Sequence, residues 1–288
     1  MPRKELYPGI LRCLRCGCVG LTAQEDSLHC PDCTQAYPIE DGKLIFSDYS
    51  KARIHDPLDW FKYHLKRFPA FYRWAVRVVS PVCPTGHLRR FLREHVRDES
   101  AIAVNLGSGN FRVSDEVYNL DLFPYDNVDL VASVDNLPFA DGSVDVVTNV
   151  AVLEHVSDPE TVVREIHRVL KPGGVVYCLF PFMQGYHASP HDFSRRTLEG
   201  VRRLHAGFDE LACGCGAGPT SGFLWVLQVW ISLILSFGIR PLQIVIRLLV
   251  MLVTFPLKYL DVILIKHPCA RDIASSFVFV GRKPLRGS

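Results

Sequence analysis

Short apolar runs alternate with polar turns through the middle of the chain. Five of them have the length and apolar density of buried parallel strands: residues 101–106, 117–120, 128–131, 144–149 and 175–180. A helix is predicted after the fourth run, because Asp158 can cap it, Pro159 suits its first turn, and apolar residues recur at helical spacing. Residues 276–283 read as a last strand. This order predicts an α/β, Rossmann-like fold with a mostly parallel sheet and a site at the carboxyl ends of its strands.

A second apolar pattern has a different length. Residues 222–239 carry no charge, and residues 242–257 carry only Arg247. Eighteen helical residues extend ~27 Å, which barely matches the hydrocarbon thickness of a bilayer. We therefore predict a helical pair at 222–265 that lies in or dips into one leaflet. A transmembrane hairpin, which would place Arg247 inside the bilayer, and a soluble homo-oligomer interface or core remain alternatives.

The insertion divides the chain into four predicted parts. A metal-binding module spans residues 1–50, a helical arm spans 51–100, and the main domain combines 101–221 with 266–288, interrupted by 222–265. Between residues 59 and 97 the arm has nine Lys and Arg against two acids, interleaved with aromatic residues. This composition suits an anionic lipid surface, single-stranded RNA, or an ordinary helical cover over the sheet.

Overall charge and cysteine usage restrict the function classes. The formal net charge of the 288 residues is only +2, so no global field favours DNA. The first residues contain no apolar core typical of a signal peptide. The ten cysteines are therefore expected in a reducing cytosol, with the protein peripheral or monotopic at the cytoplasmic face of the cell membrane.

Four of the cysteines form two paired knuckles, Cys13 with Cys16 and Cys30 with Cys33. Two CxxC turns at this spacing predict a structural Zn²⁺ site with four thiolate ligands and no open position. Cys18 is a fifth thiol that makes the ligand assignment ambiguous. Residues 9–48 resemble the small zinc-ribbon proteins that bind and activate RNA and protein methyltransferases. The segment Tyr37 to Phe46 is similar to the strand at the end of those proteins. This resemblance implies a scaffold docked in cis, and nucleic-acid binding is the alternative use.

The turns after the predicted strands carry a recognisable series of motifs. They read Asn105-Leu-Gly-Ser-Gly109, Asn119-Leu-Asp121, Asp135-Asn-Leu-Pro-Phe139, Leu153-Glu-His155 and Lys171-Pro-Gly-Gly174. Together they resemble class I S-adenosylmethionine (SAM) methyltransferases of the glycan and quinone type. The resemblance implies a ribose contact at Asp121 and an adenine contact at Asp135. The full set of expected cofactor residues is Asn105, Gly107, Ser108, Gly109, Asp121, Leu122, Asp135, Asn136, Leu137 and Asn149.

A dinucleotide site is the main alternative for this glycine turn. It would require a third glycine at position 112, which is Arg112, and a full helix facing a pyrophosphate. Only seven residues, 110–116, separate the turn from the next strand, so no ordinary crossover helix fits. SAM carries no phosphate, so the binding of SAM depends less on a full helix after this turn.

Methyl transfer to a hydroxyl needs a group that takes the proton, and histidine suits this task. The candidates at strand ends are His155, His187 and His191, with Asp192 placed to orient one of them. Arg195 and Arg196 are candidates to hold an anionic part of the acceptor. The segment 181–197 is similar to one in bacterial methyltransferases associated with glycans. We therefore expect an enzyme of class 2.1.1 that O-methylates a sugar or lipid-linked glycan. The alternatives are an RNA or quinone-type methyltransferase and a non-catalytic SAM-binding scaffold.

Overall fold

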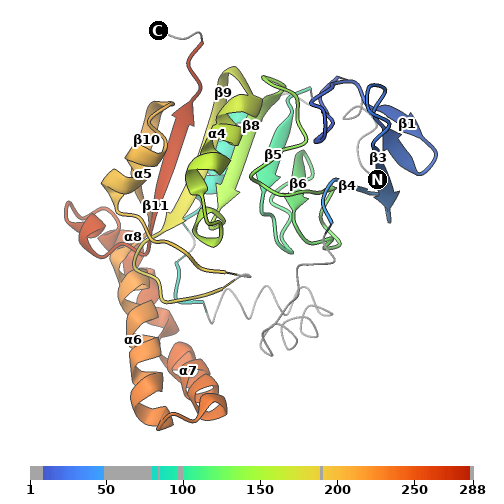
Figure 1. Ribbon diagram of the computed structural model, residues 1–288. Helices are drawn as coiled ribbons and strands as arrows, with labels where there is room; N and C mark the ends of the chain where they lie inside the picture. The colour runs from blue at the N-terminus through green and yellow to red at the C-terminus, as the bar shows by residue number, and fades with distance from the viewer. Residues whose placement is uncertain (1–8, 49–79, 84, 97–99, 189–190, 286–288) are drawn as a thin grey trace.

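The computed structural model describes residues 9–48, 80–83, 85–96, 100–188 and 191–285, and Figure 1 gives its architecture. Of the expected basic arm at residues 51–100, residues 51–79, 84 and 97–99 lie outside the described residues. The strands form one sheet in the order β1-β2-β3-β4-β7-β6-β5-β8-β9-β11-β10. Their bounds are β1 Thr22–Gln24, β2 Ser27–His29, β3 Ala36–Glu40, β4 Lys43–Ile45, β5 Ala103–Leu106, β6 Val117–Asp121, β7 Leu130–Val131, β8 Val144–Val150, β9 Leu170–Pro181, β10 Asp209–Ala217 and β11 Ser276–Arg282.

The five central strands, β7, β6, β5, β8 and β9, are all parallel. The α/β fold with a mostly parallel sheet is therefore confirmed. β11 runs antiparallel to both β9 and β10. All carboxyl ends of the parallel strands, and that of β10, consequently meet at one edge of the sheet.

Helices cover both faces of this sheet. The bounds are α3 His87–His95, η3 Leu153–His155, α4 Pro159–Val169, α5 Leu198–Leu204, α6 Pro219–Ser236, α7 Arg240–Thr254, η4 Phe255–Leu260, α8 Asp261–Leu264 and η5 Ala270–Asp272. α4 and α5 pack in one apolar cluster with Val104 and Val147, whereas α3 packs with Ala103 and Val146 on the opposite face. Adjacent strand residues point to opposite faces, so the two clusters are the two sides of the sheet.

The expected helix after β8 forms as its sequence predicts. Asp158 accepts a hydrogen bond from the backbone N–H of Thr161, and Pro159 occupies the first turn. The buried side chains of α4 are Pro159, Val162, Val163, Ile166 and Val169. The amphipathic face therefore fixes α4 on the sheet.

The cysteine module joins the sheet directly. Its last strand, β4, pairs in parallel with β7, with Leu44 opposite Leu130 and Ile45 opposite Val131. Leu11, also from the module, is fully buried and forms an antiparallel bridge with Phe139. The predicted docking in cis is thus observed as a continuous sheet.

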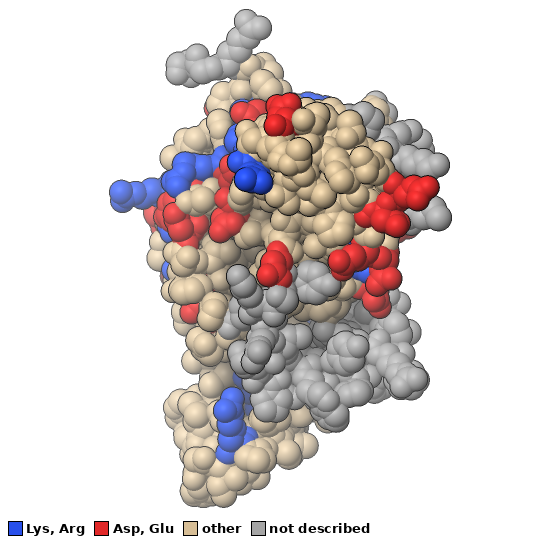
Figure 2. Space-filling view, turned by 45° about the vertical axis from the view of Figure 1, so that its right-hand side comes forward, with Lys and Arg blue, Asp and Glu red and all other residues tan. Residues whose placement is uncertain are grey.

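The apolar insertion forms the predicted helical pair. α6 starts at Pro219, three residues before the expected boundary, directly after β10. The N-terminus of α6 is held by Asp261, whose carboxylate accepts from the backbone N–H groups of Thr220 and Ser221, both at 2.8 Å. In Figure 1 the α6–α7 pair projects from the body. Its surface in Figure 2 is almost entirely uncharged, with one blue strip.

Several boundaries differ from the sequence prediction. The third strand has only two residues, Leu130–Val131, because the chain before it turns around Asp129, whose side chain accepts from the backbone of Asn119. α5 and β10 were absent from the prediction. β10 is an edge strand with its first four residues exposed, so no apolar alternation marks it.

Candidate functional site

The turn after β5 is tied to the end of β6. Gly109 donates its backbone N–H to Oδ2 of Asp121 at 2.8 Å, and Phe123 donates to Oδ1 at 3.0 Å. Asp121 is 8% exposed, and burial raises the pKa of its carboxyl although both backbone donors oppose this shift. Each carboxylate oxygen keeps lone pairs that can accept further hydrogen bonds. Asp121 therefore keeps acceptors beside the turn, and its contact with a ribose stays a prediction.

The two glycines of the turn have different roles. Both have positive φ values, 62° at Gly107 and 55° at Gly109. A Cβ at Gly107 would lie 2.3 Å from Cγ2 of Val152, so this glycine allows close packing against the chain after β8. A Cβ at Gly109 would meet no described atom within 4 Å. Of the two, only Gly109 presents bare backbone to open space, where a ligand can approach.

Two expected cofactor residues lie inside the sheet. Asn105 donates to Asn119 at 3.2 Å and accepts from Thr148 at 2.9 Å, so its side chain joins three strands. Asn149, at the end of β8, is fully buried, and its Nδ2 has no hydrogen-bond partner among the described residues. Asn149 therefore keeps a free donor, whereas the side chain of Asn105 is committed to the sheet. Ser108 is buried and lies in the turn between the two glycines. Leu122 directly follows Asp121.

The loop after β7 is fixed by charged side chains. Leu137 donates its backbone N–H to Glu165 at 2.9 Å, so this N–H is not available to an adenine ring. Arg12 donates to Oδ1 of Asn136 at 2.9 Å and to Glu165 at 3.3 Å. Asp135 and Asn136 are exposed at the tip. Of this loop, the carboxylate of Asp135 and the backbone of the tip remain as predicted adenine contacts.

Two of the predicted catalytic side chains, those of His155 and His187, approach Glu154. Glu154 is fully buried, and neither carboxylate oxygen has a hydrogen-bond partner in the described part of the chain. Nε2 of His155 and Nε2 of His187 each lie 3.7 Å from its Oε1. His155 contacts the carbonyl of His191 through Nδ1 at 2.6 Å. The nearby carboxylate of Glu154 raises the pKa of His187.

The side chain of His191 does not join this group. It is exposed and lies against the Phe193 ring at 5.5 Å. Asp192 accepts from the backbone N–H of His187 at 2.8 Å, while its nearest approach to that ring is 4.0 Å. Asp192 thus positions the His187 backbone rather than orienting its imidazole.

The two expected anion-binding arginines have protein partners. Arg195 pairs with Asp192 and donates to the carbonyls of Gln184 and Gly185. Arg196 donates to Glu160 at 2.6 Å and lies over the Phe180 ring. Both contacts shape the loop after β9, and binding of an acceptor by either arginine stays a prediction.

The apolar helices contact this loop. The indole of Trp225 in α6 lies 5.4 Å from the His187 ring, and a Cβ at Gly185 would lie 2.9 Å from its Nε1. Trp225 Nε1 is buried without a partner among the described residues. α6 therefore packs directly beside the histidine loop. Glu154 and Trp225 were not assigned a chemical role from the sequence, and their proximity depends on tertiary packing.

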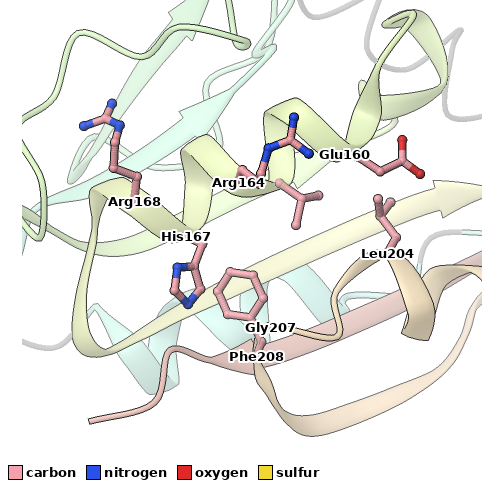
Figure 3. Close-up of a pocket in the computed structure, with 8 residues that line it drawn as sticks. Glu160, Arg164, His167, Arg168, Leu204, Gly207 and Phe208 are labelled. Carbon is pink, nitrogen blue, oxygen red and sulfur yellow. The ribbon is translucent and has the colours of Figure 1, made fainter. Parts of the chain in front are cut away.

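A surface pocket of about 520 Å³ lies elsewhere, between α4 and the segment after α5 (Figure 3). Its lining includes Arg164, His167 and Phe208, with the last two rings 5.1 Å apart. None of the expected site residues lines it. This pocket therefore does not correspond to the strand-end site.

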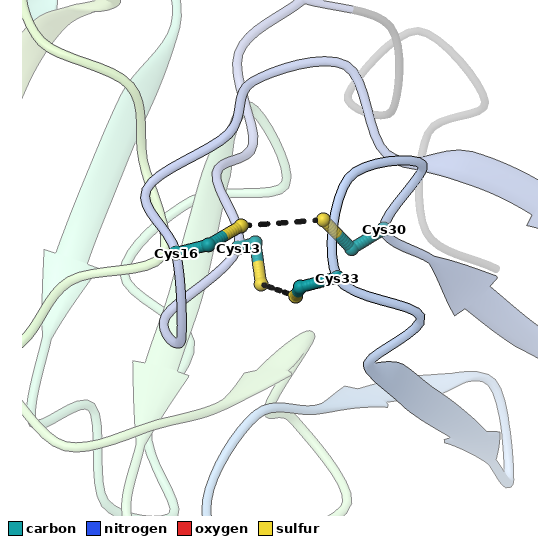
Figure 4. A group of neighbouring side chains, drawn as sticks. All are labelled: Cys13, Cys16, Cys30 and Cys33. Carbon is teal, nitrogen blue, oxygen red and sulfur yellow. Dashed lines mark hydrogen bonds between the residues drawn. The ribbon is translucent and has the colours of Figure 1, made fainter.

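The four expected zinc ligands converge (Figure 4). The Cys13 and Cys33 sulfurs are 3.5 Å apart, as are those of Cys16 and Cys30, and all four lie within 4.8 Å of one another. A tetrahedral Zn²⁺ with Zn–S bonds of about 2.3 Å requires sulfur separations of roughly 3.8 Å. The donor set therefore fits this metal. Cys18 lies outside the group, and its thiol donates to the Val19 carbonyl.

Comparison with known proteins bears on the central domain. Residues 79–178 match a family described as "Methyltransferase domain". This segment, about a third of the chain, is similar to a methyltransferase domain. The match supports the Rossmann-like methyltransferase fold and SAM as the cofactor.

Similarity to curated proteins is local. The chain is 42% identical over 69 residues to demethylmenaquinone methyltransferase of Geobacillus stearothermophilus, covering 24% of each chain. It is 30% identical over 106 residues to the Listeria welshimeri enzyme of the same name, covering 37% of this chain and 39% of that one. The chain thus spans about a quarter to two fifths of the length of these relatives.

The solved structures that the chain matches have low sequence identity to it. One is a chain of the complex between the Haloferax volcanii Trm112 methyltransferase activator and a methyltransferase, with 17% identity, a TM-score of 0.47 and coverage of 81% of this chain and 100% of that chain. Another is Haemonchus contortus phosphoethanolamine N-methyltransferase 2 with S-adenosyl-L-methionine, with 16% identity, a TM-score of 0.46 and coverage of 78% and 60%. Both TM-scores lie below 0.5, so neither neighbour bears on function.

Proposed function

We propose that this protein is a SAM-dependent methyltransferase that acts at a membrane surface on a lipid-linked acceptor. The methyltransferase-domain match over residues 79–178 carries the reaction class. The open space beside Gly109 and the adjoining carboxylate of Asp121 support SAM binding at this strand edge. In this proposal Asp121 accepts from the ribose, Asp135 accepts from the adenine amino group, and the sulfonium faces the end of β8.

The acceptor would enter from the side of the helical pair. β10 ends at the same sheet edge as the parallel strands, and α6 follows it directly. Trp225 then brings α6 against His187. A lipid-linked group held at these helices would reach the strand-end edge without leaving the membrane surface.

The polarity of α6 supports contact with lipid. Its buried residues are mainly small or polar, namely Thr220, Ser221, Gly222, Leu224, Gln228, Ser232 and Ser236. Large apolar side chains such as Phe223, Trp230 and Leu233 are exposed. This distribution is the reverse of a water-facing helix and is typical of helices packed in lipid.

α7 extends the same surface. None of its residues is buried, and its long exposed apolar side chains include Val245, Leu249 and Val253. The helices Pro219–Ser236 and Arg240–Leu264 are long and apolar enough to cross a membrane by length and composition. An apolar face of this size exceeds what water-soluble surfaces usually expose, which supports contact with lipid. We propose that the pair lies in one leaflet.

A sugar hydroxyl is the acceptor atom that we propose first. Methylation of a hydroxyl releases a proton, and His187 with Glu154 beside its Nε2 is suited to take it. A carbon of a prenylated quinone is the second candidate, favoured by the local identity to demethylmenaquinone methyltransferases. Both acceptors carry lipid tails, so both are consistent with entry of the acceptor beside the helical pair.

Transfer of labelled methyl groups separates these candidates. Incubation of the full chain with methyl-labelled SAM and membrane extract should label a lipid fraction. Label in a sugar-bearing lipid supports O-methylation, and label in an extractable quinone ring supports the second candidate. Label only in RNA, or no transfer beside intact SAM binding, would contradict the proposal.

Vesicle flotation tests membrane contact independently. The full chain should float with phosphatidylglycerol–phosphatidylethanolamine vesicles, and a variant carrying Val245→Gln, Leu249→Gln and Val253→Gln should float much less. Val19→Gln with Leu211→Gln is the matched control, since both residues are exposed and lie off the helical pair. A wild-type chain that stays with the unbound fraction would exclude this membrane contact.

A further inference from the structure

The strongest unexplained feature of the strand-end site is the bare carboxylate of Glu154. The side chain is fully buried at the start of the 3₁₀ turn η3, and neither oxygen has a hydrogen-bond partner among the described residues. A buried carboxylate without a donor is costly unless a cation or proton compensates its charge. The environment of Glu154 therefore indicates that something positive belongs beside it.

Two imidazole nitrogens face the same point. Nε2 of His155 and Nε2 of His187 each lie 3.7 Å from Oε1 of Glu154. The ligand atoms of the three residues all lie within 4.8 Å of one another. Each of the two 3.7 Å distances between Nε2 and Oε1 can be bridged by one ion with ordinary bond lengths of about 2.0–2.2 Å.

The remaining ring nitrogens select the tautomer. Nδ1 of His155 lies 2.6 Å from the carbonyl of His191, and Nδ1 of His187 lies 2.9 Å from that of Gly185. A carbonyl can only accept, so both Nδ1 atoms carry the proton and both Nε2 atoms present lone pairs. Nη2 of Arg195 lies 3.1 Å from Nδ1 of His187, but this nitrogen already donates to Gly185 and to Asp192. Backbone carbonyls that fix the outer nitrogen are typical of metal-binding histidines.

We propose that Glu154, His155 and His187 bind one divalent transition-metal cation, separate from the cysteine site. Two imidazoles and one carboxylate form a donor set that suits Zn²⁺, Fe²⁺ or Mn²⁺ and leaves positions open. This inference rests on the proposed function for the use of those positions, which would be taken by the acceptor oxygen. The cation would lower the pKa of an acceptor hydroxyl, whose proton then leaves to solvent.

The cation and a proton are alternative occupants of this group. A metal bond to Nε2 of His187 uses the lone pair that a general base would need. The surrounding charges are balanced, because Arg195 is neutralised by Asp192 at 2.7 Å. Glu154 therefore supplies the only unpaired negative charge among these contacts.

Cobalt substitution of the metal-free full chain tests the proposal, because Co²⁺ reports its ligands by absorption. The cysteine site gives thiolate-to-cobalt charge transfer, whereas the proposed site has no sulfur donor and gives only ligand-field bands. We expect two Co²⁺ equivalents in the wild-type chain. Glu154→Gln and His187→Gln should each lose the sulfur-free equivalent and keep the cysteine bands, which also report that the module is folded.

His191→Ala is the matched control, since it removes a histidine from the same loop but keeps the carbonyl that contacts His155. It should retain both equivalents. A wild-type chain that binds cobalt only at the cysteines, or a sulfur-free equivalent that survives Glu154→Gln, would overturn the proposal. A pKa of His187 that falls in Glu154→Gln without any second metal equivalent would show a proton-only site and likewise overturn it.

SAM calorimetry distinguishes this failure from failure of the proposed function. SAM binding without a second metal equivalent would contradict only the metal site. A second metal equivalent without SAM binding would support the metal site and contradict the methyltransferase proposal.

Discussion

The carboxylate of Asp121 accepts a hydrogen bond of 2.8 Å from the backbone N–H of Gly109. This contact joins the end of β6 to the turn after β5 across the short connection that contains no helix. The bond holds the turn open at Gly109, where no described atom lies within 4 Å of an added Cβ. One side chain thus shapes the turn, and its remaining lone pairs are the acceptors that we propose for a ribose.

Replacement of Asp121 should weaken cofactor binding more than folding. Hydrogen bonds to a charged group contribute about 1.5–3 kcal/mol, so Asp121→Ala is expected to lower SAM affinity by roughly 10- to 100-fold. Asp126→Ala is a suitable control, because this exposed residue lies in the connection that follows β6. Equal SAM affinities of wild type and Asp121→Ala by calorimetry would exclude the ribose contact.

Metal removal should affect the cofactor loop as well as the module. Chelation or Cys33→Ser is expected to unfold the small module, since metal binding supplies its folding free energy. The pairing of β4 with β7 would then be lost, which lowers both the thermal midpoint and SAM affinity. Cys18→Ser should leave both unchanged, because Cys18 lies outside the ligand group. A Cys33→Ser chain with native SAM affinity would argue against coupling through this strand.

Arg12 connects the module to the adenine loop. Its guanidinium contacts Asn136, the Leu137 carbonyl and Glu165. Arg12→Ala is expected to loosen the loop and weaken SAM binding by about 2- to 30-fold. Arg15→Ala changes an exposed arginine of the same knuckle and should have no effect. If both variants bind SAM like the wild type, the loop is rigid without the module.

His205 should make stability dependent on pH. It is 1% exposed, it stacks on Phe279 at 4.5 Å, and burial lowers its pKa from 6.5 to about 4. The unfolded state therefore binds the proton first, and stability present above pH 6.5 is lost as the pH falls toward 4. The loss attributable to His205 is about 3 kcal/mol.

Urea unfolding at pH 7 and at pH 5 measures this contribution. His205→Phe should lose less stability between these values than the wild type, whereas the exposed His191→Ala should behave like the wild type. A His205→Phe chain with the full wild-type acid sensitivity would show that other groups dominate.

The central sheet and α4 were predictable because their signals are local. The capping by Asp158 and the apolar face of α4 depend on residues close in sequence. The four cysteines were predictable for the same reason, since two CxxC turns each place two thiolates together. In contrast, the pairing of β4 with β7 joins residues more than eighty positions apart, and no periodicity encodes it.

The chemistry at the strand ends was only partly predictable. Histidines 155 and 187 could be named from their positions after strands, but the bare carboxylate between them appears only once the chain is folded. Leu137 shows that tertiary contacts can also remove an expected ligand contact. Leu137 was expected among the cofactor residues, and its backbone N–H instead donates to Glu165 of α4.

Calorimetric titration of SAM and of NAD into the full chain tests the central claim most directly. The open turn at Gly109, the carboxylate of Asp121 and the missing crossover helix predict saturable binding of SAM and no measurable binding of the dinucleotide. Absence of heat with SAM at high micromolar concentration, or comparable binding of NAD, would contradict the proposed methyltransferase.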